Sequence, residues 1–320
     1  MAETSSILEF ATSLSLSHCR VQNFPNFVFL CGGRLSPTDK LFSARDFFLR
    51  RLQAQKPALA KRVILAEQVS SWFKRDQFGR DQPFSDLLEL ERYLVHLAGM
   101  TVLFVESPGS IAELGAFAAL DDLRPKTLAV LNEFFGISGS FIADGLLTKI
   151  KRDSPDQVLY YNWAPDDLDS QTAAEVFCEM FDDLVAVLEL RDSNRHQTEK
   201  LDPGSLGHTL LLVADLVRMG LVVERAQLAK CLNILGCEAA AKDLERHLAI
   251  LECTGLITER RRRSGTYFIR REPVPFVQYG FKGDGKPKDM TRLQSDIRDA
   301  LDPSLRRILS TYLATEAPNG

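Results

Sequence analysis

The sequence predicts an α/β protein, with a flavodoxin-like, doubly wound parallel sheet followed by a winged-helix domain. Short apolar segments alternate with longer amphipathic segments over residues 1–190, a pattern typical of βα units around a parallel sheet. The composition becomes polar over residues 191–203, which indicates a linker. Three helical segments and a basic hairpin follow within residues 204–282, the order of elements in a winged helix.

Five strands are expected in the sheet. Each candidate is short and apolar, as strands buried on both faces are, and they lie at residues 27–31, 63–66, 101–105, 127–132 and 158–161. Helices are expected at residues 39–55, 85–98, 110–122, 139–150 and 168–190. We predict the strand order 2-1-3-4-5, which places the switch point, where ligands bind, between the first and third strands.

Gly32 and Gly33 directly follow the first strand, and Arg34 follows them. Paired glycines allow a backbone to approach a sugar or phosphate closely, and the arginine supplies positive charge. The pair is a weak signal by itself, because neither the full dinucleotide-binding fingerprint nor the P-loop lysine accompanies it. The sequence therefore gives no support for a Rossmann oxidoreductase or a P-loop NTPase.

The segment VESPGSIAELG, residues 105–115, connects the third strand to the next helix. We expect Ser110 to cap that helix and Glu113 to lie in its first turn, where the helix N-terminus favours an ionised carboxylate. The same spacing is typical of a capping box, in which Glu113 only reaches back to the N-cap amide. Because the segment faces Gly32 and Gly33 across the switch point, we favour a catalytic role for Glu113.

Two more polar residues are expected at this edge of the sheet. Glu91 belongs to a helix that begins there and shares a face with apolar residues, so it is either a solvated neighbour or a semi-buried functional group. Asn132 ends the fourth strand and is placed to donate or accept a hydrogen bond in the site.

Composition and charge limit the class of protein. The chain has 320 residues and a net charge of −4, and its length is typical of two domains. No apolar run approaches the roughly 20 residues that a membrane-spanning helix needs, and no secretory signal is recognised. The six cysteines have no CxxC spacing, so neither a metal site nor a disulfide framework is expected. We therefore expect a cytoplasmic protein with no membrane contact and no bound cofactor.

The expected second domain contains the helices Leu206–Met219, Arg225–Leu235 and Glu238–Cys253. The hairpin after them has four consecutive arginines at its tip, which on an acidic protein indicates phosphate binding rather than a solvated charged face. The third helix also carries acidic residues, so backbone or single-strand binding is favoured over reading of a base sequence. The candidate nucleic-acid contacts are Lys242, Arg246, Arg260, Arg261, Arg262, Arg263, Arg270 and Arg271.

Residues 283–320 form a C-terminal helical extension, in which Asp302 and Pro303 mark the start of a second helix. Apolar residues recur at helical spacing in both helices. These faces either dock on one of the two domains or mediate self-association, so a homo-oligomer is one of the alternatives.

At the expected switch point the sequence resembles a known family. A strand followed by Gly-Gly, an acidic helix and then E-S-P-G-S-I-A-E-L-G looks like the nucleoside deoxyribosyltransferase-like domain of type II retron effectors, the toxic proteins of bacterial anti-phage retrons. The resemblance covers about residues 20–190. Ordinary deoxyribosyltransferases read approximately D-S-G-T-x-x-E-x-G here, and their last acid attacks the anomeric carbon of the sugar. In this chain Glu106 replaces the aspartate and a proline is inserted.

The resemblance implies that Glu113 is the attacking acid, with Ser107, Gly109 and Ser110 shaping the sugar pocket. A carboxylate can stabilise or trap the oxocarbenium-like state of N-glycosidic cleavage, and water then completes a hydrolysis. The resemblance thus implies an N-glycosidase acting on NAD or on (deoxy)nucleotides. It also implies that a separate reverse transcriptase, with its multicopy single-stranded DNA and RNA, binds the effector and holds it inactive.

Two other functions remain open from the sequence. A ligand-sensing transcriptional regulator would use the winged helix to bind an operator. A housekeeping nucleotide phosphoribohydrolase would have a P-G-G-x-G-T-x-x-E turn, which this chain matches only in part, and it would leave the basic hairpin unexplained.

Overall fold

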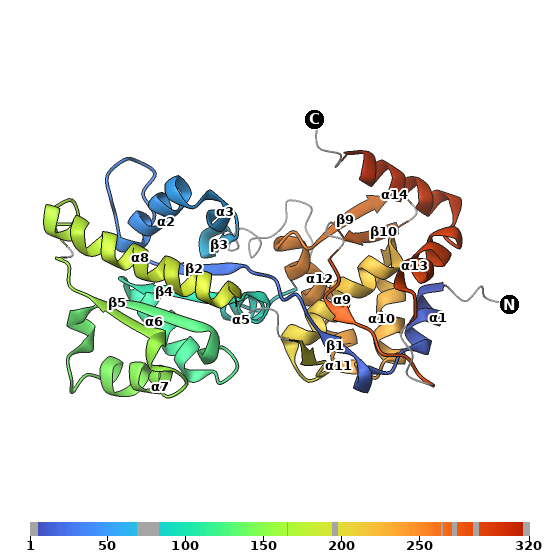
Figure 1. Ribbon diagram of the computed structural model, residues 1–320, viewed down its shortest axis with the longest axis horizontal. Coiled ribbons are helices and arrows are strands. Elements are labelled where there is room, and N and C mark those ends of the chain that lie inside the picture. Colours follow the sequence, from blue (N-terminus) through green and yellow to red (C-terminus); the bar gives the residue numbers. More distant parts are fainter. Residues whose placement is uncertain are drawn as a thin grey trace. The chain divides into compact units, whose positions relative to one another are not determined.

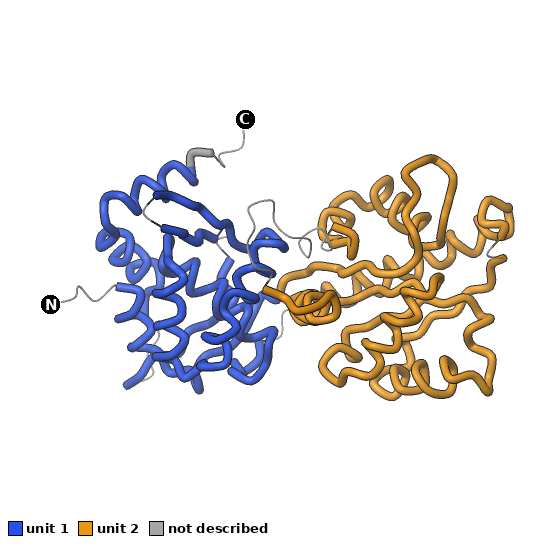
Figure 2. Tube along the Cα trace, turned by 180° about the vertical axis from the view of Figure 1, so that it is seen from behind, with its two compact units in different colours: residues 1–24, 196–320 blue, residues 25–195 orange. Residues whose placement is uncertain are grey.

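The computed structural model describes residues 6–68, 83–164, 166–193, 198–263, 265–270, 274–283 and 288–315. The chain forms two compact units, one of residues 25–195 and the other of residues 1–24 and 196–320 (Figure 2). The first 24 residues therefore belong with the C-terminal part, whereas the sequence analysis included them in a domain of residues 1–190. The reason is that helix α1 (Ser6–Ser13) buries Ile7 and Phe10 and packs against two helices of the second unit, α9 and α10.

The first unit contains a parallel sheet of five strands in the order β3-β2-β4-β5-β6 (Figure 1). This confirms the predicted strand order, with β2 as the first strand. The strands are β2 (Val28–Gly32), β3 (Val63–Leu65), β4 (Met100–Val105), β5 (Thr127–Asn132) and β6 (Val158–Tyr161). In β2 and β4 the register runs from Val28 opposite Met100 to Gly32 opposite Phe104, which places the ends of both strands side by side.

The helices of this unit lie between successive strands of the sheet, except for α8, which follows the last strand β6. They are α2 (Ala44–Gln55), α3 (Pro57–Ala60), α5 (Leu87–Leu97), α6 (Pro108–Ala119), α7 (Thr148–Lys151) and α8 (Gln171–Ser193). Short helical turns are η2 (Arg124–Lys126), η3 (Glu133–Gly136), the π-helical η4 (Phe141–Leu147) and η5 (Pro155–Gln157). The predicted helix at 39–55 begins only at Ala44, because the Ser43 side chain accepts a hydrogen bond from the Asp46 N–H and caps it.

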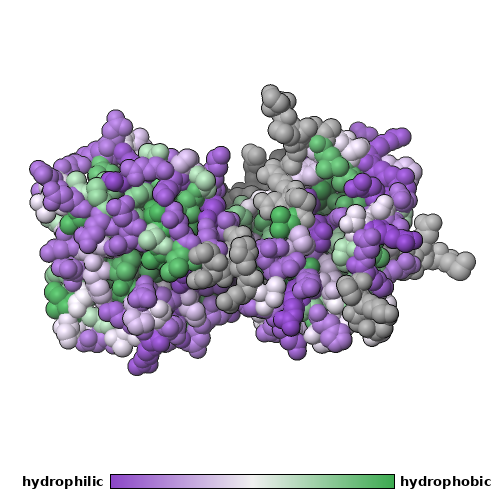
Figure 3. All heavy atoms as spheres, in the orientation of Figure 1, coloured by the Kyte–Doolittle hydropathy of each residue, from purple (hydrophilic) through white to green (hydrophobic). Residues whose placement is uncertain are grey.

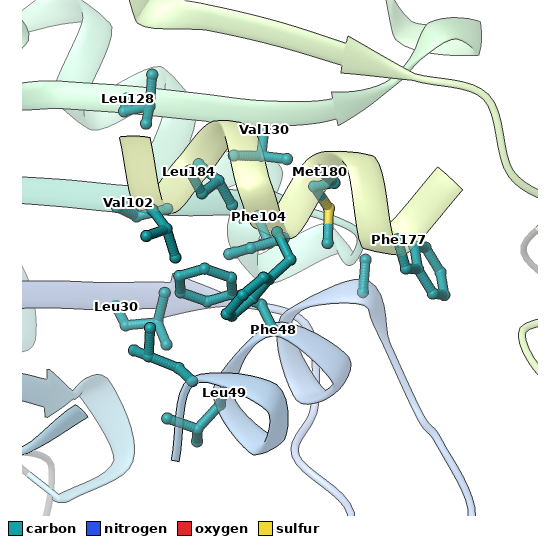
Figure 4. Close-up of a cluster of buried hydrophobic side chains, with 14 of the residues drawn as sticks. Leu30, Phe48, Leu49, Val102, Phe104, Leu128, Val130, Phe177, Met180 and Leu184 are labelled. Atoms are coloured by element: carbon teal, nitrogen blue, oxygen red, sulfur yellow. The ribbon is translucent and has the colours of Figure 1, made fainter. Parts of the chain in front are cut away.

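A large apolar core lies on one face of the sheet. Side chains of α2 and α8, among them Phe48, Phe177 and Leu184, meet alternate residues of the strands (Figure 4). Full burial of one such side chain stabilises the fold by roughly 1.5–3 kcal/mol. Helix α6 packs against β2 and β4. The sheet is thus held firmly at the strands whose ends form the expected site.

The second unit contains helices and a three-stranded antiparallel sheet in the order β8-β10-β9. Its elements are α9 (Leu206–Gly220), β8 (Val223–Glu224), α10 (Arg225–Ile234), α11 (Glu238–Lys242), α12 (Leu244–Cys253), β9 (Ile257–Arg262) and β10 (Gly265–Arg270). The expected single helix at 238–253 is divided into α11 and α12, since Asp243 between them leaves the helical conformation.

The C-terminal helices dock on this unit. Helix α14 (Pro303–Thr315) packs Ile308, Leu309 and Tyr312 against Tyr267 and Ile269 of β10, and α13 (Met290–Asp299) packs against α9. Asp302 accepts a hydrogen bond from the Ser304 N–H at the start of α14, as the sequence predicts. Of the two uses considered for these apolar faces, the described residues show docking within the chain.

The 3-10 turn η1 (Leu16–His18) leads into a second small sheet, which joins distant parts of the same unit. Strand β1 (Arg20–Val21) pairs with both β7 (Glu199–Lys200) and β11 (Val277–Gln278).

On the visible face of the molecule hydrophobic residues occur in patches among hydrophilic ones (Figure 3). None of the helices that the structure describes combines the length and apolar character needed to cross a membrane.

Candidate active site

The turn between β4 and α6 differs from the predicted capping arrangement. Ser107, not Ser110, is the N-cap of α6 and accepts a hydrogen bond from the Ser110 N–H. The buried Ser110 hydroxyl accepts from the N–H groups of Glu106 and Ser107, both at 2.9 Å. Both serine side chains are therefore engaged in shaping the turn. Gly109 is exposed, and its contact with a sugar stays a prediction.

Glu113 is the sixth residue of α6, which begins at Pro108. It lies in the second turn of the helix, so the expectation of a first-turn position is wrong. The alternative in which Glu113 reaches back to the N-cap amide is also wrong, because Ser107 and Ser110 form the capping box themselves. The Glu113 side chain is consequently available for another role.

Glu106 connects the ends of two strands to the start of α2. Its carboxylate accepts hydrogen bonds from the N–H groups of Ala44 (2.7 Å) and Arg45 (3.3 Å). A shorter aspartate at this position would reach less far toward the helix. Burial raises the pKa of Glu106 to about 7, although these two hydrogen bonds oppose the rise.

The paired glycines are explained by this packing. A Cβ on Gly33 would overlap the Glu106 carboxylate, and one on Gly32 would overlap the Phe104 carbonyl oxygen. Gly32 also has a φ of +122°, a conformation that side chains rarely adopt. The close approach that the glycines permit is thus to neighbouring parts of the chain, and an additional approach to a ligand stays a prediction.

The arginine in the interior of the site is Arg45, not Arg34. Arg34 is exposed. Arg45 is fully buried and donates hydrogen bonds to the carbonyls of Gly33 (3.0 Å) and Leu30 (2.7 Å). It also forms a bidentate ion pair with Glu67, at 2.5 and 2.8 Å. The sequence contains a signal for it, since Arg45 lies on the same helical face as the apolar residues at 48, 49 and 52.

Two more carboxyl groups of the site, besides Glu106, have pKa values near neutrality. Burial raises the pKa of Glu113 to about 7, an effect that Arg45 opposes and Glu67 reinforces. Glu91, whose side chain lies in α5 and is 6 % exposed, has a pKa raised to about 8 by burial and by the charge of Glu113. The expectation that the helix N-terminus keeps Glu113 ionised is therefore corrected, because burial determines its pKa. Near pH 7 Glu113 is about half ionised and Glu91 is mainly protonated.

Five ionisable groups interact electrostatically at this edge of the sheet. One of them is Cys31, the penultimate residue of β2. Its pKa is raised well above the usual value by burial and, to a smaller extent, by Glu113 and Glu91. The other members are Arg45, Glu67, Glu91 and Glu113. The cluster joins an ionisable carboxylate to a protonated one, a combination that serves acid and base chemistry at one centre. Within the described ranges no group of acidic, histidine or cysteine side chains is arranged to hold a metal ion.

Asn132 has a local role. Its side-chain N–H donates to the Trp163 carbonyl at 2.6 Å, and its side-chain oxygen accepts from the Phe134 N–H at 3.0 Å. Asn132 therefore caps η3 and fixes the segment after β6, and a hydrogen bond to a ligand stays a prediction.

The candidate nucleic-acid residues fall into three groups. Arg262, Arg263 and Lys242 are exposed, and the described part of the chain provides no ion-pair partner for them. Arg261 pairs with Glu259, and Arg246 pairs with Asp243. Arg260 is half-buried, with its guanidinium 5.4 Å from the centre of the Tyr312 ring.

Arg270 is a correction to the predicted set. It is 7 % exposed, donates to the Asp215 carboxylate at 2.9 Å and lies over the ring of Phe276. Because its charge is buried and paired, Arg270 cannot contact a phosphate in this conformation. Arg271 lies outside the described residues.

The comparisons with known proteins agree with the resemblance stated above. A family model described as STM3845 retron effector protein matches residues 42–259, which include Glu67, Glu91, Glu106 and Glu113. The chain belongs to this retron effector family.

Two relatives from Escherichia coli give the same result. The protein named "Retron Ec73 putative ribosyltransferase/DNA-binding protein" is 28 % identical over 253 residues, which are 74 % of this chain and 75 % of the relative. The protein named "Retron Ec86 putative ribosyltransferase/DNA-binding protein" is 28 % identical over 143 residues, 44 % of this chain and 42 % of the relative. The prediction of a retron effector is thus confirmed.

Proposed function

We propose that this retron effector is an N-glycosidase that cleaves the N-glycosidic bond of NAD or of a (deoxy)nucleotide. In this proposal residues 25–195 form a nucleoside deoxyribosyltransferase-like domain. The main observation in support is the electrostatic interaction of Glu113 in α6, with a pKa of about 7, and Glu91 in α5, with a pKa of about 8. The names of the two relatives, which describe ribosyltransferases, agree with glycosyl transfer as the class of reaction.

The chemistry assigns a different role to each carboxyl group. Ionised Glu113 attacks or stabilises the anomeric carbon as the bond from that carbon to the base nitrogen breaks. The electron pair of that bond leaves with the base, and protonated Glu91 donates a hydrogen bond or a proton to the leaving group. Water then adds its oxygen to the anomeric carbon, displaces Glu113 where a covalent bond has formed, and gives a proton to deprotonated Glu91 or to the released base. The products are the free base and a sugar with a hydroxyl group at that carbon.

The second unit supplies the nucleic-acid contact. We assign its helices and the β9–β10 hairpin to a winged helix, whose tip presents Arg262 and Arg263 to phosphates. The ligand in this proposal is the multicopy single-stranded DNA, with its RNA, of a partner reverse transcriptase. The names of the relatives include DNA binding, which agrees with this assignment.

Binding of the reverse transcriptase and its DNA holds the enzyme inactive in this proposal, because uncontrolled cleavage of NAD or nucleotides would harm the cell. Such coupling is a difference in the binding free energy of the active and inactive states. A 100-fold inhibition requires about 2.7 kcal/mol, which is within the ordinary range for allostery.

The test is an assay of the purified protein, alone and in complex with the reverse transcriptase and DNA. NAD and a panel of ribo- and deoxynucleotides are incubated with each, and the released bases are identified by mass spectrometry. We expect release from at least one substrate class by the protein alone, and less release by the complex. If no base is released in any state while the protein binds duplex DNA in a sequence-specific manner, the result contradicts the proposal and favours a transcriptional regulator.

A further inference from the structure

Arg45, in the first turn of α2, is held by more hydrogen bonds than its ion pair with Glu67 alone provides. One terminal nitrogen of its guanidinium donates to the Gly33 carbonyl and to Glu67, and the other donates to the Leu30 carbonyl and to Glu67. Leu30 lies in β2, and Gly33 directly follows this strand. A bidentate pair with two extra acceptors fixes the plane and position of a guanidinium.

The ion pair is asymmetric in its exposure. The Arg45 side chain is 0 % exposed, whereas that of Glu67 is 54 % exposed. Solvent therefore screens the charge of Glu67 more than that of Arg45. The charge of Arg45 is left with an influence on its other buried neighbours, and it acts on both Glu113 and Cys31.

Two complementary atoms in this cluster lack a hydrogen-bond partner among the described residues. Arg45 Nε, a donor, and Glu113 Oε2, an acceptor, are both buried without one. A buried polar atom without a partner costs about 1–3 kcal/mol, so such atoms are uncommon away from functional sites. Buried atoms outside the cluster, such as Thr101 Oγ1 and Gln157 Oε1, also lack a partner among the described residues, so this feature supports a site only together with the geometry of the Arg45–Glu67 pair.

We propose that Arg45 and Glu67 are positioning residues for the reaction: Arg45 favours the ionised form of Glu113, and Glu67 fixes the guanidinium and moderates its charge. The role of the two residues in the reaction rests on the proposed function. Their effect on the charge of Glu113 does not depend on it. Neither residue is assigned contact with the substrate. Their effect passes through the charge of Glu113.

The direction of each effect follows from the groups that surround Glu113. These are Arg45 in α2, Glu67 after β3, Glu91 in α5 and Cys31 in β2. Burial raises the pKa of Glu113, Arg45 opposes this rise, and Glu67 adds to it. Loss of the Glu67 charge should lower the pKa of Glu113, and loss of the Arg45 charge should raise it. From a pKa of about 7, a change of one unit makes the ionised fraction at pH 7 about 90 % or about 10 %.

The experiment compares Glu67→Gln and Arg45→Met with the control Glu189→Gln. Glu189 also pairs with a cation and its side chain is 56 % exposed, close to the value for Glu67, but it lies in α8. The pKa of Glu113 is measured by ¹³C NMR on the protein labelled at the glutamate carboxyl carbons, with the signal assigned through Glu113→Gln. The acid limb of the kcat/KM pH profile is measured on the same variants.

Glu67→Gln should shift the pKa of Glu113 and the acid limb downward, Arg45→Met should shift both upward, and Glu189→Gln should shift neither. If Arg45→Met does not fold, Glu67→Gln alone tests the inference. The Glu67 side chain is 54 % exposed, and this substitution keeps its size. An unchanged pKa in Glu67→Gln, or a loss of activity by the same factor at every pH, overturns the inference. The NMR titration needs no turnover, so the predicted shifts in a protein that cleaves no substrate would contradict the proposed function and leave the electrostatic pair established.

Discussion

Each unit of this molecule buries an arginine beside a carboxylate, and the two arrangements differ in how far the carboxylate is exposed to solvent. In the second unit Asp215 and Arg270 both have side chains that are 0 % exposed. Asp215 accepts hydrogen bonds from Arg218, from Arg270 and from the Phe276 N–H, at 2.9 to 3.0 Å. The Asp215–Arg270 pair is closed to solvent, and the network joins α9 to the segment after β10.

In the first unit the corresponding pair is Arg45 and Glu67. This pair is open to solvent at its carboxylate, because the Glu67 side chain is 54 % exposed. Other carboxyl groups lie within electrostatic reach of it, and two of them, Glu91 and Glu113, have pKa values of about 8 and about 7. The comparison shows that burial of charge alone does not identify a site. A buried ion pair that is shielded from solvent on both sides indicates a structural role, whereas buried carboxyl groups with raised pKa values beside a partly exposed pair indicate chemistry.

The largest effect on stability should come from the closed network. Asp215→Asn leaves two buried guanidinium groups without a counter-ion, and removal of one partner from a buried pair costs about 3–5 kcal/mol. Urea unfolding of the second unit, followed by circular dichroism, measures the loss. A cost below about 1 kcal/mol would mean that the network is not the structural element described here.

Glu91→Gln should have the next largest effect, and it should act on catalysis. General acid catalysis typically contributes about 10²–10⁴-fold, so we expect kcat/KM to fall by about 100-fold and the limb of the pH profile near 8 to disappear. Glu89→Gln, on a half-buried side chain of the same helix that accepts hydrogen bonds from Ser85, is the control. Equal activity of the two variants would remove Glu91 from the mechanism.

The same variant should change the pH dependence of stability. The pKa values of Glu91 and Glu113 are raised above 4.5 in the folded protein, so the folded state binds more protons than the unfolded state between about pH 4.5 and 8. Stability from these groups is present at low pH and is lost as the pH rises through that window. Glu91→Gln should therefore make the free energy of unfolding less dependent on pH. A wild type that becomes steadily more stable from pH 5 to 8, with no change in the variant, would contradict the assignment.

The prediction for the wing separates Arg270 from the exposed arginines. Arg262→Ala/Arg263→Ala should reduce the slope of log K against log salt for single-stranded DNA by about 1.4, since each lost phosphate contact accounts for about 0.7. Lys61→Ala/Arg152→Ala removes two exposed charges from the first unit and should leave the slope unchanged. Equal slopes in all three proteins would show that the wing does not bind phosphates.

Much of the first unit was predictable because its signals are local. Buried strands are short apolar runs, and their alternation with helices determines a parallel sheet with few permitted strand orders. Glu113 is predicted as a site residue because its turn has a characteristic sequence, and its catalytic role stays a prediction. Arg45 was missed although its helical face was visible, because its partners Gly33 and Glu67 lie 12 and 22 residues away.

The second unit shows why other assignments were wrong. Arg270 was grouped with the wing because it is close to it in sequence, but its partner Asp215 lies 55 residues earlier. Similarly, residues 1–24 have no local feature that marks them as part of the C-terminal unit, since β1 is only two residues long and pairs with strands more than 170 residues away. The partner of Arg270 and the unit to which residues 1–24 belong both depend on contacts between segments that are distant in the sequence.

The central claim is that the open cluster is catalytic while the closed one is structural, and Glu113→Gln tests it most directly. This variant preserves size and hydrogen bonding but removes the charge. Base release and the free energy of unfolding are measured on the same preparation, beside wild type and Glu89→Gln. The account predicts a loss of activity of about 10³-fold or more with an unfolding free energy within about 1 kcal/mol of wild type. A folded Glu113→Gln protein that releases base at the wild-type rate would contradict it.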